Sequence, residues 1–150
     1  MSDAPRSGSE VAVFVTRQQA AEVLIVRRVP GDGGYWHVVA GGVEPGELPR
    51  DTAVRELWEE TGLVARVQPA AEVIEYWYPL TEEPAERRAL YAPGVERVDV
   101  TCFLVTAPDG WEPTLNEEHD DYRWCSPGEA AATLRWPETA AALADLLGRG

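Results

Sequence analysis

The chain has 150 residues, of which 45% are hydrophobic, so it is long enough to form one ordinary domain with a buried core. Its formal net charge of −13 argues against a partner that is a long nucleic acid or an anionic membrane surface. No apolar run is long enough to span a membrane, and the first ten residues lack the core of a signal peptide, so we expect a cytoplasmic protein.

Secondary structure is predicted from turn signals and from runs of β-branched and apolar residues. The N-terminal residues 1–9 are polar and are expected to be flexible. Pro49 suits the first turn of a helix over residues 49–61, and Gly62 suits its end. A capping box at Ser126 opens a short helix, and a last helix covers residues 137–147. The predicted strands are residues 11–16, 22–28, 35–40, 64–67, 71–78, 97–106 and 122–125, with a charged loop over residues 79–88.

No linker interrupts this order of elements, so we interpret residues 1–150 as a single domain. Strands that alternate with one central and one terminal helix predict an α/β fold. Its expected architecture is an α/β/α sandwich with a mixed central β-sheet.

The central helix carries a fixed pattern of charged residues. Gly41 is followed after five residues by Glu47, and seven residues later the chain reads Arg-Glu-Leu-Trp-Glu-Glu-Thr-Gly-Leu. This spacing places Glu56, Glu59 and Glu60 on one face of a helix, at positions i, i+3 and i+4. Three adjacent carboxylates repel one another unless a cation lies among them, and hard divalent cations prefer such oxygen ligands. The pattern predicts a metal site suited to phosphate chemistry.

A solvated face of an amphipathic helix is the simpler explanation for the three glutamates. It does not account for the two glycines, Glu47 and Arg55 at their fixed offsets. The full pattern is G-x5-E-x7-R-E-U-x-E-E-x-G-U, with U aliphatic, and on it the chain resembles the Nudix hydrolases, which include the MutT-like enzymes. The resemblance implies the sandwich fold and a pyrophosphohydrolase that cleaves a nucleoside diphosphate linked to another moiety.

The resemblance also implies roles for individual residues. Glu56, Glu59, Glu60 and the backbone carbonyl of Gly41 would hold Mg²⁺ or Mn²⁺, which would polarise a phosphoryl oxygen and activate a water. Arg55 would pair with Glu47 and orient the glutamates.

The general base is less clearly indicated by the sequence. Glu56 is one candidate, and Glu118 is another, because relatives often bring a glutamate from a separate loop to the metal. Glu117 and Glu118 are otherwise explained as an exposed acidic turn. We interpret His119 as a loop residue rather than a ligand, because the helix already supplies hard oxygen ligands.

Candidate substrate-binding residues lie outside the helix. Arg27 and Arg28 end a strand, where alternation sends one side chain to each face, and one of them could reach the substrate phosphates. Trp36 could stack on a base, although core packing also explains it. Tyr91 opens the segment Tyr-Ala-Pro-Gly-Val, which allows close approach of the backbone to a ligand but also suits a plain turn.

These segments, together with Glu118 and His119, are similar to the branch containing dihydroneopterin triphosphate pyrophosphohydrolase. The predicted substrate is therefore a small nucleoside or pterin triphosphate. Pro79, at an offset associated with ADP-ribose pyrophosphatases, keeps ADP-ribose or a nucleotide sugar open as an alternative. A non-catalytic nucleotide-sensing domain is the alternative from another functional class.

Two cysteines, Cys102 and Cys125, lie in apolar or aromatic runs and are expected to be buried free thiols in a reducing compartment. The sequence leaves open whether the chain forms a homodimer.

Overall fold

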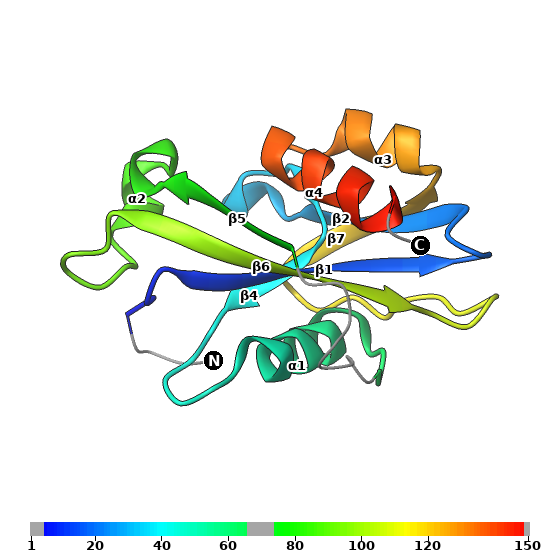
Figure 1. Ribbon diagram of the computed structural model, residues 1–150, viewed down its shortest axis with the longest axis horizontal. Helices are drawn as coiled ribbons and strands as arrows, with labels where there is room; N and C mark the ends of the chain where they lie inside the picture. The colour runs from blue at the N-terminus through cyan, green and yellow to red at the C-terminus, as the bar shows by residue number, and fades with distance from the viewer. Residues whose placement is uncertain (1–4, 66–73, 149–150) are drawn as a thin grey trace.

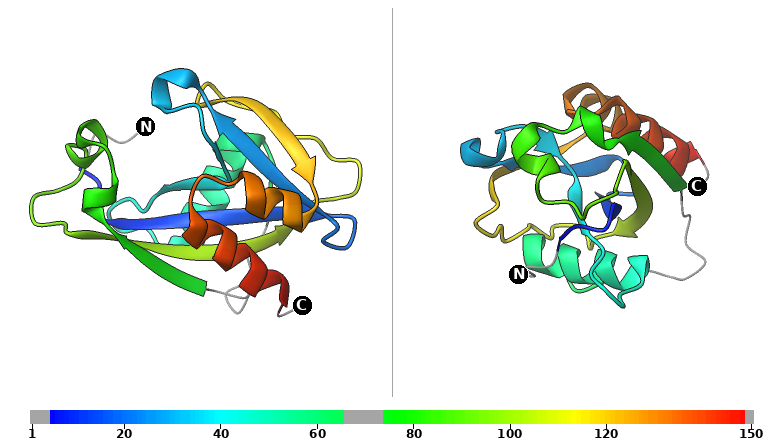
Figure 2. Two further views of the ribbon diagram at one scale, coloured as in Figure 1. Left: turned by 90° about the horizontal axis from the view of Figure 1, so that it is seen from above. Right: turned by 90° about the vertical axis from the view of Figure 1, so that its left-hand side faces the viewer.

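The computed structural model describes residues 5–65 and 74–148. Within them, one seven-stranded sheet separates two groups of helices (Figure 1). The helix α1 covers one face, and α3 and α4 cover the other, which the right-hand view of Figure 2 shows end-on. The predicted α/β/α sandwich is confirmed. The elements are β1 (Ser9–Arg17), β2 (Glu22–Arg28), η1 (Pro30–Asp32), β3 (Trp36–His37), β4 (Val39–Gly42), α1 (Pro49–Thr61), β5 (Ile74–Pro79), η2 (Leu80–Glu82), α2 (Ala85–Arg88), β6 (Arg97–Thr106), β7 (His119–Cys125), α3 (Pro127–Thr133) and α4 (Pro137–Gly148).

The sheet is mixed, as expected. Its main order is β3-β2-β1-β6-β5, with β4 paired to β1 and β7 paired to β2. The β1–β6 pair is parallel, and the other strand pairs are antiparallel. This topology brings β4, α1 and the start of β7 to the same region, although more than 70 residues separate β4 from β7 in the sequence.

Strand alternation divides the hydrophobic core into two layers. Along β1, Phe14 faces α3 and α4, whereas Val13 and Val15 face α1. All three side chains are fully or almost fully buried. Both cysteines are free and buried, as predicted. None of the described helices is long and apolar enough to cross a membrane.

Several predicted elements need correction. The single strand over residues 35–40 is two strands, because the chain pairs first with β2 and then, after Val38, with β1. The predicted loop over residues 79–88 contains η2 and α2. In the predicted strand over residues 64–67, Val64 and Ala65 are not in a strand, and residues 66 and 67 lie outside the described residues, as do 71–73 of the next strand.

The N-terminal stretch expected to be flexible is ordered from Arg6 onward. The Arg6 amide donates to the carbonyl of Leu90, and the Arg6 carbonyl accepts from the amide of Ala92, both at 2.8 Å. β1 already begins at Ser9. Residues 1–4 lie outside the described part of the chain.

Candidate metal and phosphate site

Helix α1 holds the three predicted glutamates in different environments. Its buried face packs Ala53 and Leu57 against the sheet. Glu60 lies on this buried side and is only 1% exposed, while the Glu56 and Glu59 side chains are 13% and 44% exposed. The helix therefore presents a gradient from a buried carboxylate to a half-exposed one.

Gly41 in β4 lies directly against Glu56. A Cβ atom at position 41 would be 2.6 Å from Cγ of Glu56 and closer still to its carboxylate. Only glycine permits this approach of carboxylate to backbone. The Gly41 backbone therefore lies against the acidic face of α1.

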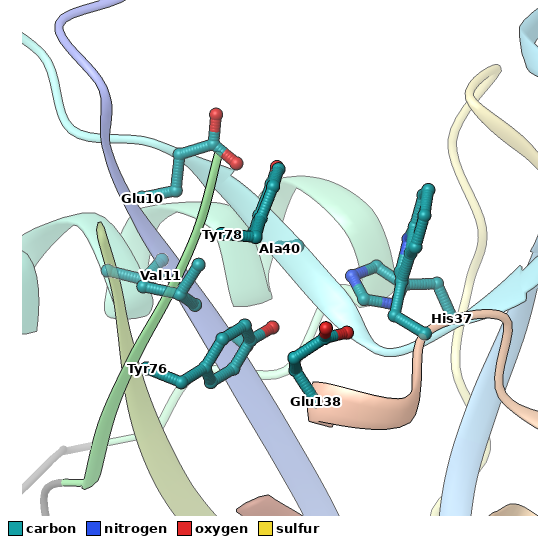
Figure 3. Close-up of a pocket in the computed structure, with 10 residues that line it drawn as sticks. Glu10, Val11, His37, Ala40, Tyr76, Tyr78 and Glu138 are labelled. Carbon is teal, nitrogen blue, oxygen red and sulfur yellow. The ribbon is translucent and has the colours of Figure 1, made fainter. Parts of the chain in front are cut away.

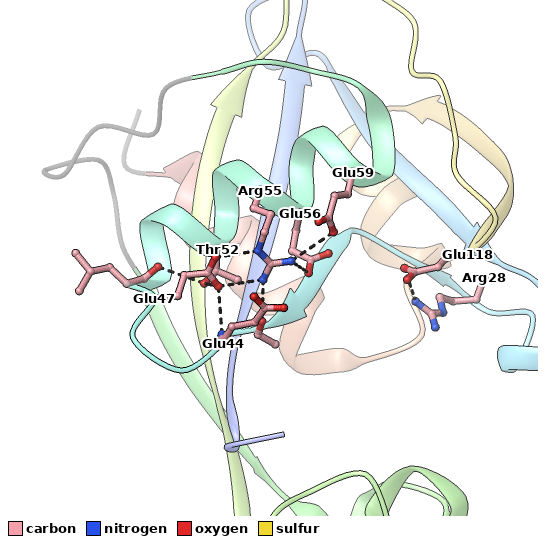
Figure 4. A network of polar contacts seen from close by, with 10 residues as sticks. Arg28, Glu44, Glu47, Thr52, Arg55, Glu56, Glu59 and Glu118 are labelled. Carbon is pink, nitrogen blue, oxygen red and sulfur yellow. Dashed lines mark hydrogen bonds and ion pairs between the residues drawn. The ribbon is translucent and has the colours of Figure 1, made fainter. Parts of the chain in front are cut away.

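Arg55 fixes the orientation of the neighbouring acids (Figure 4). Its Nε donates to Glu47 Oε2 at 2.8 Å, and its NH1 group donates to Glu56 Oε1 at 2.8 Å. Its NH2 group reaches the carbonyl of Gly42 at 3.2 Å. The hydrogen bonds from Arg55 lower the pKa of Glu47 to about 2, so this carboxylate stays ionised. The expected pair of Arg55 and Glu47 is therefore formed.

Two further candidate ligands, Glu118 and His119, lie near Glu60 of α1 at the start of β7. Carboxylate oxygens of Glu60 and Glu118 and a ring nitrogen of His119 all lie within 4.8 Å of one another. His119 Nε2 is 3.7 Å from Glu60 Oε1. The other oxygen of Glu60 and the Nδ1 atom of His119 are buried without a hydrogen-bond partner among the described residues.

The electrostatics of this group fit a divalent cation. Burial and the adjacent Glu56 raise the pKa of Glu60 well above its ordinary value, and burial also raises the pKa of Glu56. Burial lowers the pKa of His119 to about 4, which leaves its imidazole neutral near pH 7. Crowded carboxylates with an unpartnered buried oxygen are costly without a cation, and the oxygen-rich donor set is one that Mg²⁺ or Mn²⁺ accepts.

A β-bulge places His119 beside α1. Arg27 pairs with Asp121, but Arg28 pairs with His119, so Asp120 is an extra residue on β7. This shift turns His119 to the same side as Tyr122 and Trp124, which pack on the α1 side of the sheet. Our interpretation of His119 as a loop residue is wrong, because it begins β7 and is 5% exposed.

A groove of about 730 Å³ runs along the acidic face of α1. It is lined by six predicted site residues, namely Arg28, Gly41, Arg55, Glu56, Glu59 and Glu118. Arg28 NH1 is 3.7 Å from Glu118 Oε2, at the end of the groove formed by β2 and β7. The sequence did not indicate the groove residues Arg6, Glu44 and Asn116, which come from loops or strand ends without a local signal.

Three predicted substrate residues do not line this groove. Arg27 pairs with Asp120 at 2.8 Å and lies over the ring of Trp36. Trp36 packs against the core on the α3 and α4 side. Tyr91 is 7% exposed, and its hydroxyl donates to Glu10. The structure therefore separates Arg27, Trp36 and Tyr91 from the acidic face of α1.

Comparisons with known proteins find relatives that match most of this chain. The dihydroneopterin triphosphate diphosphatase of Haemophilus influenzae is 29% identical over 143 residues, which cover 92% of this chain and 86% of that protein. An octanoyltransferase of Myxococcus xanthus is 36% identical over 124 residues, but this chain spans only 30% of its length. The solved structure of the E. coli dihydroneopterin triphosphate pyrophosphohydrolase has a TM-score of 0.80 at 24% identity, with 98% and 99% of the chains covered.

The sequence pattern of the NUDIX domain matches residues 6–146, which is nearly the whole chain. This span includes every element described above except the end of α4. The chain therefore belongs to the NUDIX domain family.

Proposed function

We propose that this chain is a divalent-metal-dependent pyrophosphohydrolase that converts a small nucleoside or pterin triphosphate into the monophosphate and pyrophosphate. One observation carries the proposal: Glu56, Glu60 and Glu118 converge from two distant segments beside a groove large enough for a nucleotide. Pyrophosphate cleavage needs mainly positioning and charge neutralisation, which this arrangement supplies.

The metal ion would be held by Glu56, Glu59 and Glu60 with the carbonyl of Gly41. When bound, it would supply charge neutralisation for the phosphates and acidify the attacking water. Arg55 does not act on the substrate in this proposal. It holds Glu56 and Glu47 in place through its guanidinium fork.

Two further residues have proposed roles at the β2–β7 end of the groove. Glu118 would accept the proton of the attacking water, and its 38% exposure and its position directly before β7 support this role. Arg28 would bind a phosphate oxygen, and this role is supported by its place in the lining of the groove and by its Nε atom, which has no partner among the described residues.

The substrate class is supported by the relative from Haemophilus influenzae, whose name gives dihydroneopterin triphosphate as its substrate. ADP-ribose or a nucleotide sugar remains the alternative substrate class, on the position of Pro79 at the end of β5. A nucleotide-sensing domain without catalysis is disfavoured, because all three α1 glutamates and their orienting arginine are present.

A pyrophosphate-release assay separates these functions. The protein is incubated with Mg²⁺ and a panel of nucleoside triphosphates, dihydroneopterin triphosphate, ADP-ribose and a nucleotide sugar. We expect pyrophosphate and a monophosphate from the triphosphates. Cleavage of ADP-ribose alone would overturn the substrate class, and binding without turnover of any compound would overturn the enzymatic function.

The buried free thiols Cys102 and Cys125 support our further proposal that the protein works in a reducing compartment.

A further inference from the structure

A loop over residues 107–118 joins β6 to β7, and Glu118 is its last residue. Loops of about 12 residues or more without helix or strand are uncommon in compact domains and are usually functional or disordered. This loop is ordered, because contacts fix it at several points. Near β6, the amide of Gln18 donates to Asp109 Oδ1 at 2.9 Å, and Trp111 packs against the core on the α1 side.

The loop is also attached to the helix that carries the predicted metal ligands. The amide of Thr114 donates at 2.8 Å to the carbonyl of Thr61, the last residue of α1. A carbonyl at the end of a helix has no partner within the helix, so it is free to accept this bond. The next residue, Leu115, packs against the core on the α1 side. The loop is therefore fixed relative to the glutamates of α1 just before it reaches Glu118.

Asn116 connects this anchored part of the loop to Glu118. Its Oδ1 atom accepts a hydrogen bond from the amide of Glu118 at 3.2 Å, and its carbonyl accepts from the amide of His119 at 3.4 Å. An asparagine that bonds the amide two residues further on closes a turn with its own side chain. On the other side, the carbonyl of Glu118 accepts from the amide of Val29 at 3.1 Å. Of these bonds, the one to Asn116 Oδ1 is formed by a side chain, so a substitution can remove it.

The turn sends two neighbouring glutamates in different directions. Glu117 and Glu118 are its central residues. Glu117 is exposed, whereas the carboxylate of Glu118 lies in the cluster with Glu60 and His119. Asn116 itself lines the groove next to both glutamates. The conformation of the turn therefore decides which carboxylate reaches the acidic face of α1.

The loop contributes to the groove alone. Figure 3 shows a separate pocket, which Tyr76 and Glu138 help to line on the α3 and α4 side of the sheet. The structure describes every residue of the loop, and none of them lines this pocket. A change at Asn116 should therefore affect the groove and leave the pocket unaltered.

We propose that Asn116 is a positioning residue, which fixes the backbone of Glu118 and so keeps its carboxylate beside Glu60 at the groove. The inference rests on the proposed function, in which Glu118 is the general base. A base must lie within hydrogen-bond reach of the proton that it accepts, and a displacement of about 1 Å can lower a rate roughly 100-fold. Without the bond to Asn116, the backbone of Glu118 is held on one side only.

The kinetic test removes the acceptor oxygen and then restores it. At saturating triphosphate, Asn116→Ala should lower kcat about tenfold or more, and KM should change less than about twofold. Asn116→Asp keeps an acceptor oxygen and should return kcat to within about threefold of the wild-type value. A wild-type kcat in the alanine variant, or equally low kcat values in both variants, would overturn the proposal.

Asp109→Ala is the matched control for this test. It removes the same kind of hydrogen bond, from a side-chain oxygen to a backbone amide, near the other end of the same loop. It should leave kcat within about twofold of the wild-type value. A loss as large as that of Asn116→Ala would show that general anchoring of the loop matters rather than the bond to Glu118.

A double substitution shows whether Asn116 acts through Glu118. In the Glu118→Gln background, Asn116→Ala should change kcat less than about twofold, because the group that it positions is already lost. A general disturbance of the groove would lower kcat by the same factor in both backgrounds, and that result would overturn the proposal.

Amide hydrogen exchange tests the inference without turnover. In metal-free protein in EDTA, NMR should show that Asn116→Ala speeds exchange of the Glu118 amide at least about threefold, the effect of losing one hydrogen bond. Asn116→Asp should exchange as the wild type does. If exchange changes in this way but the wild type hydrolyses no triphosphate, the positioning role stands and the proposed function fails. If triphosphates are hydrolysed but exchange in Asn116→Ala equals that of the wild type, the positioning role alone fails.

Discussion

Arg55 combines several structural tasks in one side chain. It contacts Glu47, Glu56 and Glu59 and reaches the carbonyl of Gly42 in β4. A guanidinium can serve several acceptors at once because its five N–H groups form a planar fork. The position of Glu56 against Gly41 therefore depends on a residue that needs no contact with substrate.

Replacing this fork with a single ammonium tests that dependence. Arg55→Lys keeps the positive charge but cannot hold Glu47 and Glu56 together. We expect kcat to fall by about 10- to 100-fold, the usual effect of losing a partner that orients metal ligands. Steady-state pyrophosphate release gives kcat, and titration of Mn²⁺ gives the metal affinity. A lysine variant with wild-type kcat would show that Arg55 does not orient the acids.

Glu118 and Glu117 form a matched pair for testing the general base. Glu118 is 3.7 Å from Arg28 and within the cluster with Glu60, whereas Glu117 is exposed. Glu118→Gln should lower kcat by about 100-fold or more with little change in KM, because proton transfer contributes that much to typical rates. Glu117→Gln should leave both constants nearly unchanged. Equal, small effects from both substitutions would make Glu56 the better candidate.

His37 gives the fold a defined response to acid. Burial, together with the nearby charges of Arg28, His119 and Arg87, lowers the pKa of His37 from 6.5 to about 3. The unfolded chain binds this proton near pH 6.5 but the folded chain does not, so the stability is full above pH 6.5 and declines as pH falls toward 3. In the His37→Gln variant, the free energy of unfolding should decline less steeply between pH 6.5 and 4 than in the wild type. Urea unfolding in EDTA at several pH values measures this free energy. Equal slopes against pH for the variant and the wild type would contradict the prediction.

At the residue scale, sequence reasoning worked where the spacing was local. The positions of Glu56, Glu60 and Arg55 follow from helix geometry and the family pattern. The burial of His119 follows from a bulge in a strand pair, which no local pattern indicates. The same holds for Trp36, whose environment depends on Arg27 and Arg123 from two different strands.

At the scale of elements, α1 shows how local signals define a boundary. The helix begins at Pro49 and ends at Thr61 with Gly62 in the left-handed conformation, at a φ of 80°. The amide of Gly62 donates to the carbonyl of Trp58 at 2.8 Å. Both limits agree with the prediction because proline and glycine act on their own backbone.

Gly62→Ala tests this end of the helix. A Cβ atom would lie 3.8 Å from Thr114, an ordinary contact, so the cost arises from the backbone conformation alone. We expect the free energy of unfolding to fall by about 1–2 kcal/mol. Gly128→Ala is the control, because Gly128 lies within α3 and its Cβ would meet nothing within 4 Å. Urea denaturation should find the control as stable as the wild type or more so.

Two of the mistaken elements, the strand over residues 35–40 and the start of β7, share a cause. The break at Val38 arises because the chain changes its pairing partner from β2 to β1. β7 begins three residues earlier than predicted because Arg28 and its neighbours offer pairing partners to His119 and Asp121. Pairing between distant segments decides both features, and such contacts leave no periodicity in the local sequence.

At the scale of the whole molecule, the net charge of −13 makes the acidic site costly without cations. Mg²⁺ or Mn²⁺ should bind the folded state only and stabilise it by mass action. At a concentration 100 times the Kd the gain is about 2.7 kcal/mol, which corresponds to a rise in Tm of roughly 5–10 °C. Differential scanning fluorimetry with and without EDTA measures this shift. Glu60→Gln should abolish most of it, and an unchanged wild-type Tm would contradict the metal site.

The extra residue Asp120 has a consequence for how this protein tolerates changes in length. Side chains on a strand alternate between faces, but a bulge lets two residues occupy one pairing position, so the register before Asp121 decides which face His119 occupies. If Asp120 instead paired with Arg28, His119 would move to the opposite side of the sheet from Glu60. Glu118, His119 and every α1 glutamate would still be present in the sequence. Deleting Asp120 would remove the bulge yet leave His119 opposite Arg28, so the arrangement depends on the pairing register and tolerates the loss of this residue.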